Sequence, residues 1–302
     1  MWARHGAGSR LITLRGPVLV GTDLSRSAEE ALRQGAELAD ALYSTLLVCH
    51  VIPEVLPDIT LFAEYKRTHG QIEQSILGKA REAVQEHLDG VLKKGSAPRA
   101  IILDYGTPHV GLLSAAEENG AGVIVVGPGA TALDIVRHAS SAVLTARPSP
   151  NGPVVGATDF SDPSLPALAV AASEARRRST RLHLLHAWDL NVFTERRAPA
   201  TAMPYLQGRS WIALEGLDEL QAVAQQRLEE SLRDAHVPGD VAIVSGSAAE
   251  VIVGYAESVG AGLLVVGTHG RSGFKRLTLG TTAASVIERA PCSVLVVRLV
   301  EA

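Results

Sequence analysis

The chain contains only two cysteines, Cys49 and Cys292, among its 302 residues. Each lies in an apolar stretch typical of a buried strand, so we expect two buried thiols in a reducing compartment and not a disulfide. The sequence also lacks any apolar run near the roughly 18 residues that a membrane span requires. It has no long basic run, and its formal net charge is −4. These absences argue against a membrane protein and against a nucleic-acid-binding protein.

The first sixteen residues, "MWARHGAGSRLITLRG", contain three arginines and no acidic residue. They lack the apolar segment and the small-residue cleavage site of a secretory signal. A transit peptide is the alternative, but we expect a poorly ordered extension. With 46% hydrophobic and 20% charged residues, the rest of the chain has the composition of a globular protein, and we expect it to be cytoplasmic.

The chain contains two copies of one unit. The clearest match is between "PVLVGTDLSRSAEEAL", from Pro17, and "PVVGATDFSDPSLPAL", from Pro153, which pairs Asp23 with Asp159. A second match is between "GAGVIVVG" at 120–127 and "GAGLLVVG" at 260–267. The repeated unit is about 140 residues long, which indicates a duplicated domain. We therefore predict an extension at 1–16 and two domains at 17–150 and 151–302.

Short apolar stretches alternate with helical patterns inside each copy. In the first copy the predicted strands are 17–22, 45–51, 99–104, 122–127 and 141–147. Ser27 and Glu30 suggest a capping box for a helix that runs to about Ala41. The segments 69–94 and 110–120 have the periodicity of two further helices. Strands that are apolar on both faces and separated by helices predict an α/β fold with a doubly wound parallel sheet.

A glycine-rich loop follows the fourth predicted strand of the second copy, in "VVGTHGRSGFKRLTLGTT" (265–282). It ends where a helical pattern begins at Thr281. Free backbone N–H groups and a helix N-terminus are suited to an anion, and glycine allows close approach to the backbone. The loop matches neither the P-loop nor the GxGxxG motif. The alternative is a simple turn in which Thr281 is an ordinary N-cap.

Over residues 17–299 the chain resembles a tandem universal stress protein. The resemblance rests on a first strand that ends in Thr-Asp ("GTDLS", "GATDFS"), a second strand similar to "LHV", and the pattern Gly-x2-Gly-x9-Gly-Ser/Thr in the second copy. It implies strand order 3-2-1-4-5 in each Rossmann-like domain. It also implies that the two domains pair through their last strands as an intramolecular pseudo-dimer, which could dimerise further. ATP-binding members of the family hold the nucleotide between the first and fourth strands.

The resemblance also implies a role for individual residues. Asp159 and Ala157 would lie against the base and ribose, and Ala187 and Val266 would line the adenine pocket. The residues that would hold ribose and phosphates are Gly267, Gly270, Gly280, Thr281 and Thr282. Mg²⁺ would accompany the phosphates, although no carboxylate is evidently dedicated to it. The alternative for Asp159 is a carboxylate that only closes an Asx turn or caps a helix.

The first copy departs from this pattern. Its corresponding loop is only "GPGAT" (127–131), eleven residues shorter, without the basic residues. Pro128 also removes one N–H donor. Asp23 and Val51 remain, but we predict that this copy does not bind ATP and serves a structural role. A smaller ligand, such as a monophosphate or an adenosine moiety, is the alternative.

Efficient catalysis is not expected, because the loop has no carboxylate or glutamine placed to orient a nucleophile. Slow ATP hydrolysis or autophosphorylation stays open, as does a scaffold or chaperone-like role without nucleotide. His183 and His186 lie three residues apart on a strand and so point to opposite faces, which argues against joint metal binding. We interpret His186 and its counterpart His50 as packed strand-end histidines. The segment 188–211 is long for a connection and suggests a lid or an interaction loop.

Overall fold

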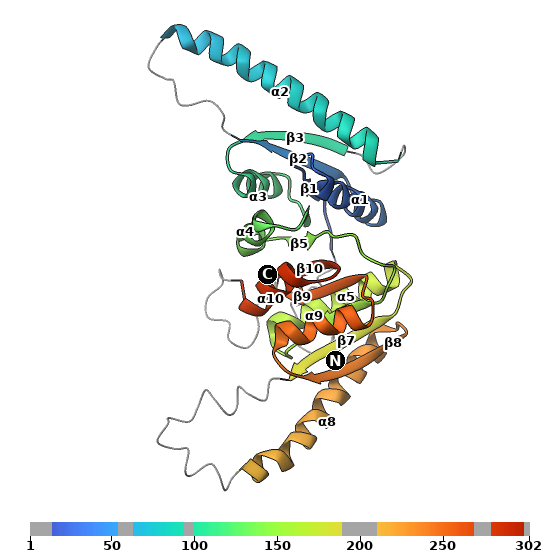
Figure 1. Cartoon of the computed structure of the whole chain (residues 1–302). Coiled ribbons are helices and arrows are strands. Elements are labelled where there is room, and N and C mark those ends of the chain that lie inside the picture. The colour runs from blue at the N-terminus through green and yellow to red at the C-terminus, as the bar shows by residue number, and fades with distance from the viewer. Residues whose placement is uncertain (1–13, 54–62, 94–98, 189–209, 269–278, 299–302) are drawn as a thin grey trace, which may run out of the picture. The chain divides into compact units, whose positions relative to one another are not determined.

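The computed structural model describes residues 14–53, 63–93, 99–188, 210–268 and 279–298. The chain divides into two compact units, Leu14–Pro148 and a second that contains Ser149–Ala302, and each is described separately (Figure 1). The predicted extension lies almost wholly outside the described residues. So do most of the segment 188–211 and Gly270.

The first unit has a five-stranded sheet in the order β3-β2-β1-β4-β5, in which all neighbouring strands are parallel. Its strands are β1 (Val18–Gly21), β2 (Leu46–Ile52), β3 (Arg99–Tyr105), β4 (Val123–Val126) and β5 (Ala142–Thr145). Its helices are α1 (Arg26–Ala41), α2 (Ala63–Val91), α3 (Pro108–Glu118) and α4 (Ala130–His138). The observed order is the expected 3-2-1-4-5.

The second unit repeats this arrangement with the order β8-β7-β6-β9-β10, again parallel throughout. Its strands are β6 (Val154–Ala157), β7 (Leu182–Trp188), β8 (Gly239–Ser245), β9 (Leu263–Gly267) and β10 (Ser293–Val297). Its helical segments are the 3-10 turn η1 (Asp162–Ser164), α5 (Leu165–Arg177), α8 (Ser210–Ala235), α9 (Ala248–Ser258) and α10 (Thr281–Arg289). The predicted doubly wound α/β fold is confirmed in both units.

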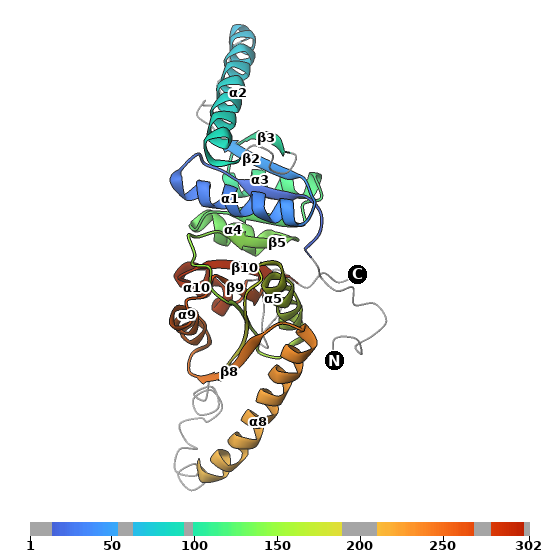
Figure 2. The ribbon, with the colours of Figure 1, turned by 90° about the vertical axis from the view of Figure 1, so that its right-hand side faces the viewer.

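Both sheets are covered on both faces. In the first unit α1 and α2 pack on one side and α3 and α4 on the other; in the second, α5 and α8 lie opposite α9 and α10 (Figures 1 and 2). All four residues of β1 and of β6 are buried as a result. The apolar character of these strands on both faces therefore has a direct structural cause. Cys49 and Cys292 are buried, and neither forms a disulfide, as expected.

The start of α1 corrects one prediction. The N-cap is Ser25, whose Oγ accepts a hydrogen bond from the N–H of Ala28 at 3.4 Å. Ser27 is already helical, and Glu30 pairs with Arg33 at 2.6 Å, so the predicted Ser27–Glu30 capping box is wrong. The reason is the preceding turn, in which Asp23 Oδ1 accepts the Ser25 N–H at 3.0 Å and fixes Ser25 as the cap.

The long helix of the first copy also begins earlier than the segment 69–94 suggested, at Ala63, and ends at Val91. Among the described helices, none is both long enough and apolar enough to cross a membrane.

Candidate functional site

The candidate site lies at the carboxyl edge of the sheet in the second unit. β6 pairs with β7 on one side and with β9 on the other. Strand order reverses between β6 and β9, which is where open parallel sheets form a ligand crevice. Asp159 follows β6, and Gly267 is the last residue of β9. The topology therefore brings the predicted Asp159 and the glycine loop to one edge.

The turn after β6 is held by its own side chains. Asp159 Oδ1 accepts hydrogen bonds from the N–H and the Oγ of Ser161 at 3.0 and 2.5 Å. The N–H of Phe160 donates to Thr158 Oγ1 at 2.9 Å, and Phe160 has a φ of 62°. Asp159 thus closes an Asx turn, which was the alternative role considered for it. It is half-buried, while Ala157, two residues before it, is buried in β6.

His186 is a packed histidine at the end of β7. It is only 6% exposed, and its Nδ1 lies 2.7 Å from the carbonyl oxygen of Thr158. Its ring centroid is 4.7 Å from that of Phe160 and 6.1 Å from that of Trp188. The ring therefore joins β7 to the turn after β6. The neighbouring Ala187 is half-buried and paired with Val244 of β8.

The loop after β9 is closed at its base by two backbone hydrogen bonds. Val266 is buried and Gly267 half-buried. The N–H of Thr268 donates to the carbonyl of Val297 at 3.2 Å, and the N–H of Gly280 donates to the carbonyl of Thr268 at 2.9 Å. The amide of Gly280 is therefore used inside the protein. Gly280 can offer a ligand close approach to its backbone, but not a free N–H.

Helix α10 begins at this edge without a side-chain cap. Gly280 is the N-cap, and its carbonyl accepts the N–H of Ala284 at 3.0 Å. Within the described part of the chain, the amides of Thr281 and Thr282 have no hydrogen-bond partner. Thr281 is exposed and is the first helical residue, so it is not the plain N-cap considered as the alternative. Two free amides and the positive end of the helix dipole suit an anion.

The first unit carries the same turn but a different loop. Asp23 Oδ1 accepts the N–H and Oγ of Ser25 at 3.0 and 2.5 Å, as Asp159 does for Ser161. Partial burial acts to raise the pKa of Asp23, but the hydrogen bonds from Ser25, with the nearby His50, lower it below its ordinary value. A Cβ added to Gly127 would lie 3.3 Å from the carbonyl oxygen of Ser27. The start of α1 thus lies against the end of β4.

A further cluster in the second unit was not anticipated from the sequence. His183 Nδ1 lies 3.0 Å from the hydroxyl of Tyr255, and His183 Nε2 lies 3.4 Å from Asp240 Oδ2, which also accepts from Arg181 at 2.8 Å. Burial lowers the pKa of His183 and raises that of Tyr255. One signal for this cluster was present in the sequence: at the position of His183 the first copy has Leu47, so the second copy carries an imidazole where the first has an apolar residue.

No group of three or more His, Cys, Asp or Glu side chains suited to a metal ion occurs in the portion of the chain that the structure covers. His183 contacts Tyr255 and Asp240, whereas His186 contacts Thr158 and Phe160. The two imidazoles therefore have separate partners, as their spacing on the strand predicted.

Comparison with known proteins gives a consistent family assignment. The model of the universal stress protein family matches twice, at residues 15–147 and 150–298. A universal stress protein of Mycobacterium tuberculosis is 28% identical over 310 residues, which cover 93% of this chain and 96% of that protein. One from Methanocaldococcus jannaschii is 32% identical over 146 residues, 48% of this chain and 81% of that protein. The crystal structure of a universal stress protein from Archaeoglobus fulgidus shares the fold, with a TM-score of 0.59 and 19% identity, covering 93% of this chain and 96% of that one.

Proposed function

Because this chain belongs to the universal stress protein family, as a member with two tandem units, we propose that its second unit binds ATP at the edge between β6 and β9. Binding of the nucleotide would control a stress-response or regulatory role of the protein. The observation that carries the proposal is that β6, which Asp159 follows, pairs with β9 at the point where strand order reverses, and that α10, next along the chain after β9, begins without a side-chain cap. The carboxylate of Asp159 is suited to accept hydrogen bonds from hydroxyls, and the start of α10 is suited to bind phosphate.

The nucleoside end would lie over β6 and β7. Asp159 is half-buried at the carboxyl end of β6, where a carboxylate is a natural acceptor for ribose hydroxyls or an adenine amino group. Ala157, Ala187 and Val266 are small or apolar residues on the neighbouring strands β6, β7 and β9. Small or apolar side chains are suited to contact with a flat base.

The phosphate end would lie at the start of α10. The amides of Thr281 and Thr282 are the donors that this proposal requires, and the helix dipole adds positive potential. Gly267 and Gly280 border the loop, and Gly270 lies within it, so the backbone could approach phosphate oxygens closely. Mg²⁺ would arrive with the triphosphate, held by phosphate oxygens and water, since the described residues supply no multi-carboxylate cage for it.

The first unit is proposed not to bind ATP. Its loop is eleven residues shorter, and Gly127 lies against Ser27. Asp23 is exposed, whereas Asp159 is half-buried. The first unit thus keeps the turn of the candidate site but lacks the long glycine loop that would hold a triphosphate. Pairing of the two units through their last strands, further dimerisation and a cytoplasmic location stay predictions.

The test is calorimetric titration of the full chain with Mg-ATP. We expect one site per chain, and we expect Asp159→Asn to weaken binding about tenfold, because a neutral oxygen replaces a charged acceptor. Asparagine can still accept the Ser161 N–H through Oδ1, so the turn should persist. Asp23→Asn makes the same change in the first unit and should leave binding unchanged.

Two outcomes would overturn the proposal. One is two sites per chain, or equal losses in the Asp23 and Asp159 variants, which would contradict the restriction to the second unit. The other is an absence of saturable binding, which would favour the scaffold or chaperone-like role. Phosphate release from the ATP-bound protein, with Gly280→Asp as the control, distinguishes a slow ATPase from a switch.

A further inference from the structure

Two histidines of the first unit lie close together on neighbouring helices. His109 is the second residue of α3, and His138 is the last residue of α4, which packs against α3 (Figure 1). Their ring centroids are 6.5 Å apart, and the planes of the two rings differ by 25°. The pair lies outside the candidate nucleotide edge, which belongs to the second unit.

The hydrogen bond of His138 prepares one of its ring nitrogens for a ligand. Its Nδ1 lies 2.8 Å from the carbonyl oxygen of Asp134, one turn earlier in α4. Because a carbonyl oxygen only accepts, Nδ1 carries the proton of the neutral ring and Nε2 keeps its lone pair. Metal-binding histidines are commonly held in this way, since a hydrogen bond from the second nitrogen fixes the orientation of the ring. His138 is exposed, so an ion can reach it from solvent.

His109 has no hydrogen bond that would have to be broken. Its side chain forms no hydrogen bond or ion pair with the part of the chain that the structure describes. The residue is half-buried, but neither of its ring nitrogens is among the buried side-chain atoms that lack a partner. Both nitrogens are therefore accessible to a ligand from solvent.

The second unit has neither imidazole. Ala249 of α9 and Arg289 of α10 occupy the equivalent positions, and α9 and α10 pack on each other as α3 and α4 do. The fold therefore does not require a histidine at either place. Contact between the two rings also contributes little, because 6.5 Å is near the outer limit of the distance between interacting aromatic rings. A ligand shared by both imidazoles accounts for their occurrence together.

The separation of the rings is compatible with a shared metal ion. An ion about 2.1 Å from each coordinating nitrogen holds the two ring centroids about 5 Å apart. The observed distance of 6.5 Å is about 1.5 Å longer than this. Rotation of the His109 side chain can close the gap, because this side chain has no hydrogen bond to lose.

The surrounding charges nearly balance. Arg137, beside His138, pairs with the carboxylate of Asp134 at 2.9 Å. The C-terminal end of α4 favours a cation, whereas the N-terminal end of α3 opposes it. Affinity must therefore come from the two imidazoles. Imidazole is a ligand of zinc, copper and nickel, whereas Mg²⁺ and Ca²⁺ prefer oxygen.

We propose that His109 and His138 together bind a divalent transition-metal ion of the zinc, copper or nickel type. Water completes the coordination, because the site lies at the surface and the protein supplies two ligands. The inference is independent of nucleotide binding in the second unit.

The test is titration of the full chain with Zn²⁺, followed by calorimetry and by the imidazole NMR signals. We expect a saturable site whose occupation shifts the signals of His109 and His138. His109→Ala and His138→Arg each introduce the residue of the second repeat, so both variants should fold. Each should bind Zn²⁺ at this site at least about tenfold more weakly, because a single imidazole loses the advantage of two linked ligands.

Two controls accompany these variants. His236→Asn removes an exposed histidine of the second unit and should leave this binding unchanged. Mg²⁺ has the same charge as Zn²⁺ but prefers oxygen ligands, so it should not displace Zn²⁺. The proposal is overturned if the wild-type chain shows no saturable binding of Zn²⁺, if the signals of His109 or His138 do not move, or if either variant binds as the wild-type chain does. An equal loss in His236→Asn would also overturn it.

Discussion

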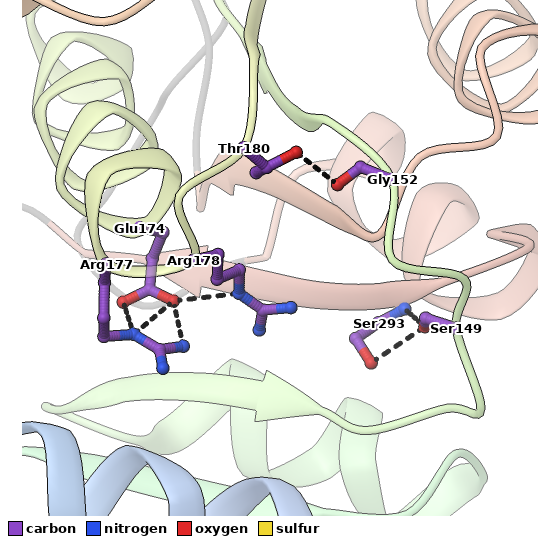
Figure 3. Close-up of polar contacts among 7 residues, drawn as sticks. All are labelled: Ser149, Gly152, Glu174, Arg177, Arg178, Thr180 and Ser293. Atoms are coloured by element: carbon purple, nitrogen blue, oxygen red, sulfur yellow. Dashed lines mark hydrogen bonds and ion pairs between the residues drawn. The ribbon is translucent and has the colours of Figure 1, made fainter.

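Arg177 forms a bidentate ion pair with the carboxylate of Glu174 at the end of α5. The Nε of Arg177 lies 3.0 Å from Oε1 and 3.1 Å from Oε2 of Glu174, and its Nη2 lies 2.6 Å from Oε2 (Figure 3). Arg178 reaches the same Oε2 at 3.3 Å. The Glu174 side chain is only 5% exposed, while both arginines are at least a quarter exposed. A buried acid is thus held by two cations that keep contact with water.

Glu174→Ala should lower the free energy of unfolding of the second unit by about 3 kcal/mol, because it removes a buried, bidentate ion pair and leaves a void. Glu174→Leu should cost about 1 kcal/mol or less, since leucine fills the space and the first repeat has the buried Leu38 at this place. Urea unfolding followed by tryptophan fluorescence checks both, because Trp188 lies in β7.

The control for this prediction is Glu29→Ala in the first unit, whose unfolding is followed by circular dichroism because residues 14–148 contain no tryptophan. Its pair with Arg33 is a third or more exposed on both sides, and exposed pairs contribute about 0–1 kcal/mol. If Glu174→Ala lowers the free energy of unfolding by no more than Glu29→Ala does, burial does not strengthen the Glu174–Arg177 ion pair.

His183 should make the stability of the second unit depend on pH. Burial lowers its pKa below the ordinary 6.5; Asp240 partly opposes this, and Arg181 adds to it. The unfolded imidazole therefore binds a proton more readily than the folded one. The stability that the neutral His183 provides is present above about pH 6.5 and is lost as the pH falls through the lower folded pKa.

His183→Leu introduces the residue of the first repeat and should flatten this dependence. The measurement is the difference in unfolding free energy between about pH 7.5 and about pH 5, which we expect to be smaller in the variant than in the wild-type chain. His236 is exposed, so His236→Asn should leave the difference unchanged. An equal pH dependence in the wild-type and His183→Leu chains would remove His183 as its source.

The two thiols should be inert in the folded protein. Cys49 is 1% exposed and Cys292 is fully buried. Burial, with the nearby Asp104, raises the pKa of Cys49 to about 12, so almost no thiolate forms at about pH 8. A thiol reagent at this pH should label neither cysteine before unfolding and both after it. Tyr43→Cys, at a position that is 99% exposed, should react at once.

The fold could be predicted because its determinants are local in the sequence. Strands such as Val18–Gly21 are apolar on both faces, and this pattern alone indicates a parallel sheet between helix layers. Parts of the candidate site could also be predicted from local sequence. Asp159 and Gly267 each end a strand, and the ends of neighbouring parallel strands meet at one edge.

What could not be predicted depends on contacts between distant segments. His183, Asp240 and Tyr255 are far apart in sequence and meet only because β7 pairs with β8 and packs on α9. The bond from Gly280 to Thr268 spans a loop, so nothing in the glycine spacing shows that this amide is already used. Ser25 was missed as a cap because Ser27 and Glu30 fit the capping-box pattern, whereas Ser25 is followed three residues later by Ala28.

Thr281→Pro tests the phosphate end of the candidate site by removing one N–H. Position 281 is the first residue of α10, where proline is favoured, and Gly280 before it has a ψ of 145°, which a following proline accepts. The helix should therefore form as before. We expect Mg-ATP to bind about tenfold more weakly, because one charge-assisted hydrogen bond from the backbone is lost.

Two further variants test whether weaker binding of Mg-ATP is due to loss of the Thr281 N–H. Thr281→Ala removes the hydroxyl and keeps the N–H, so a weaker effect than that of proline attributes the loss to the backbone. Ala130→Pro makes the same change at the first residue of α4 in the first unit and should leave binding intact. If Thr281→Pro binds Mg-ATP as tightly as the wild-type chain while its thermal unfolding is unchanged, the amide of Thr281 does not contact phosphate. The start of α10 is then not the anion site.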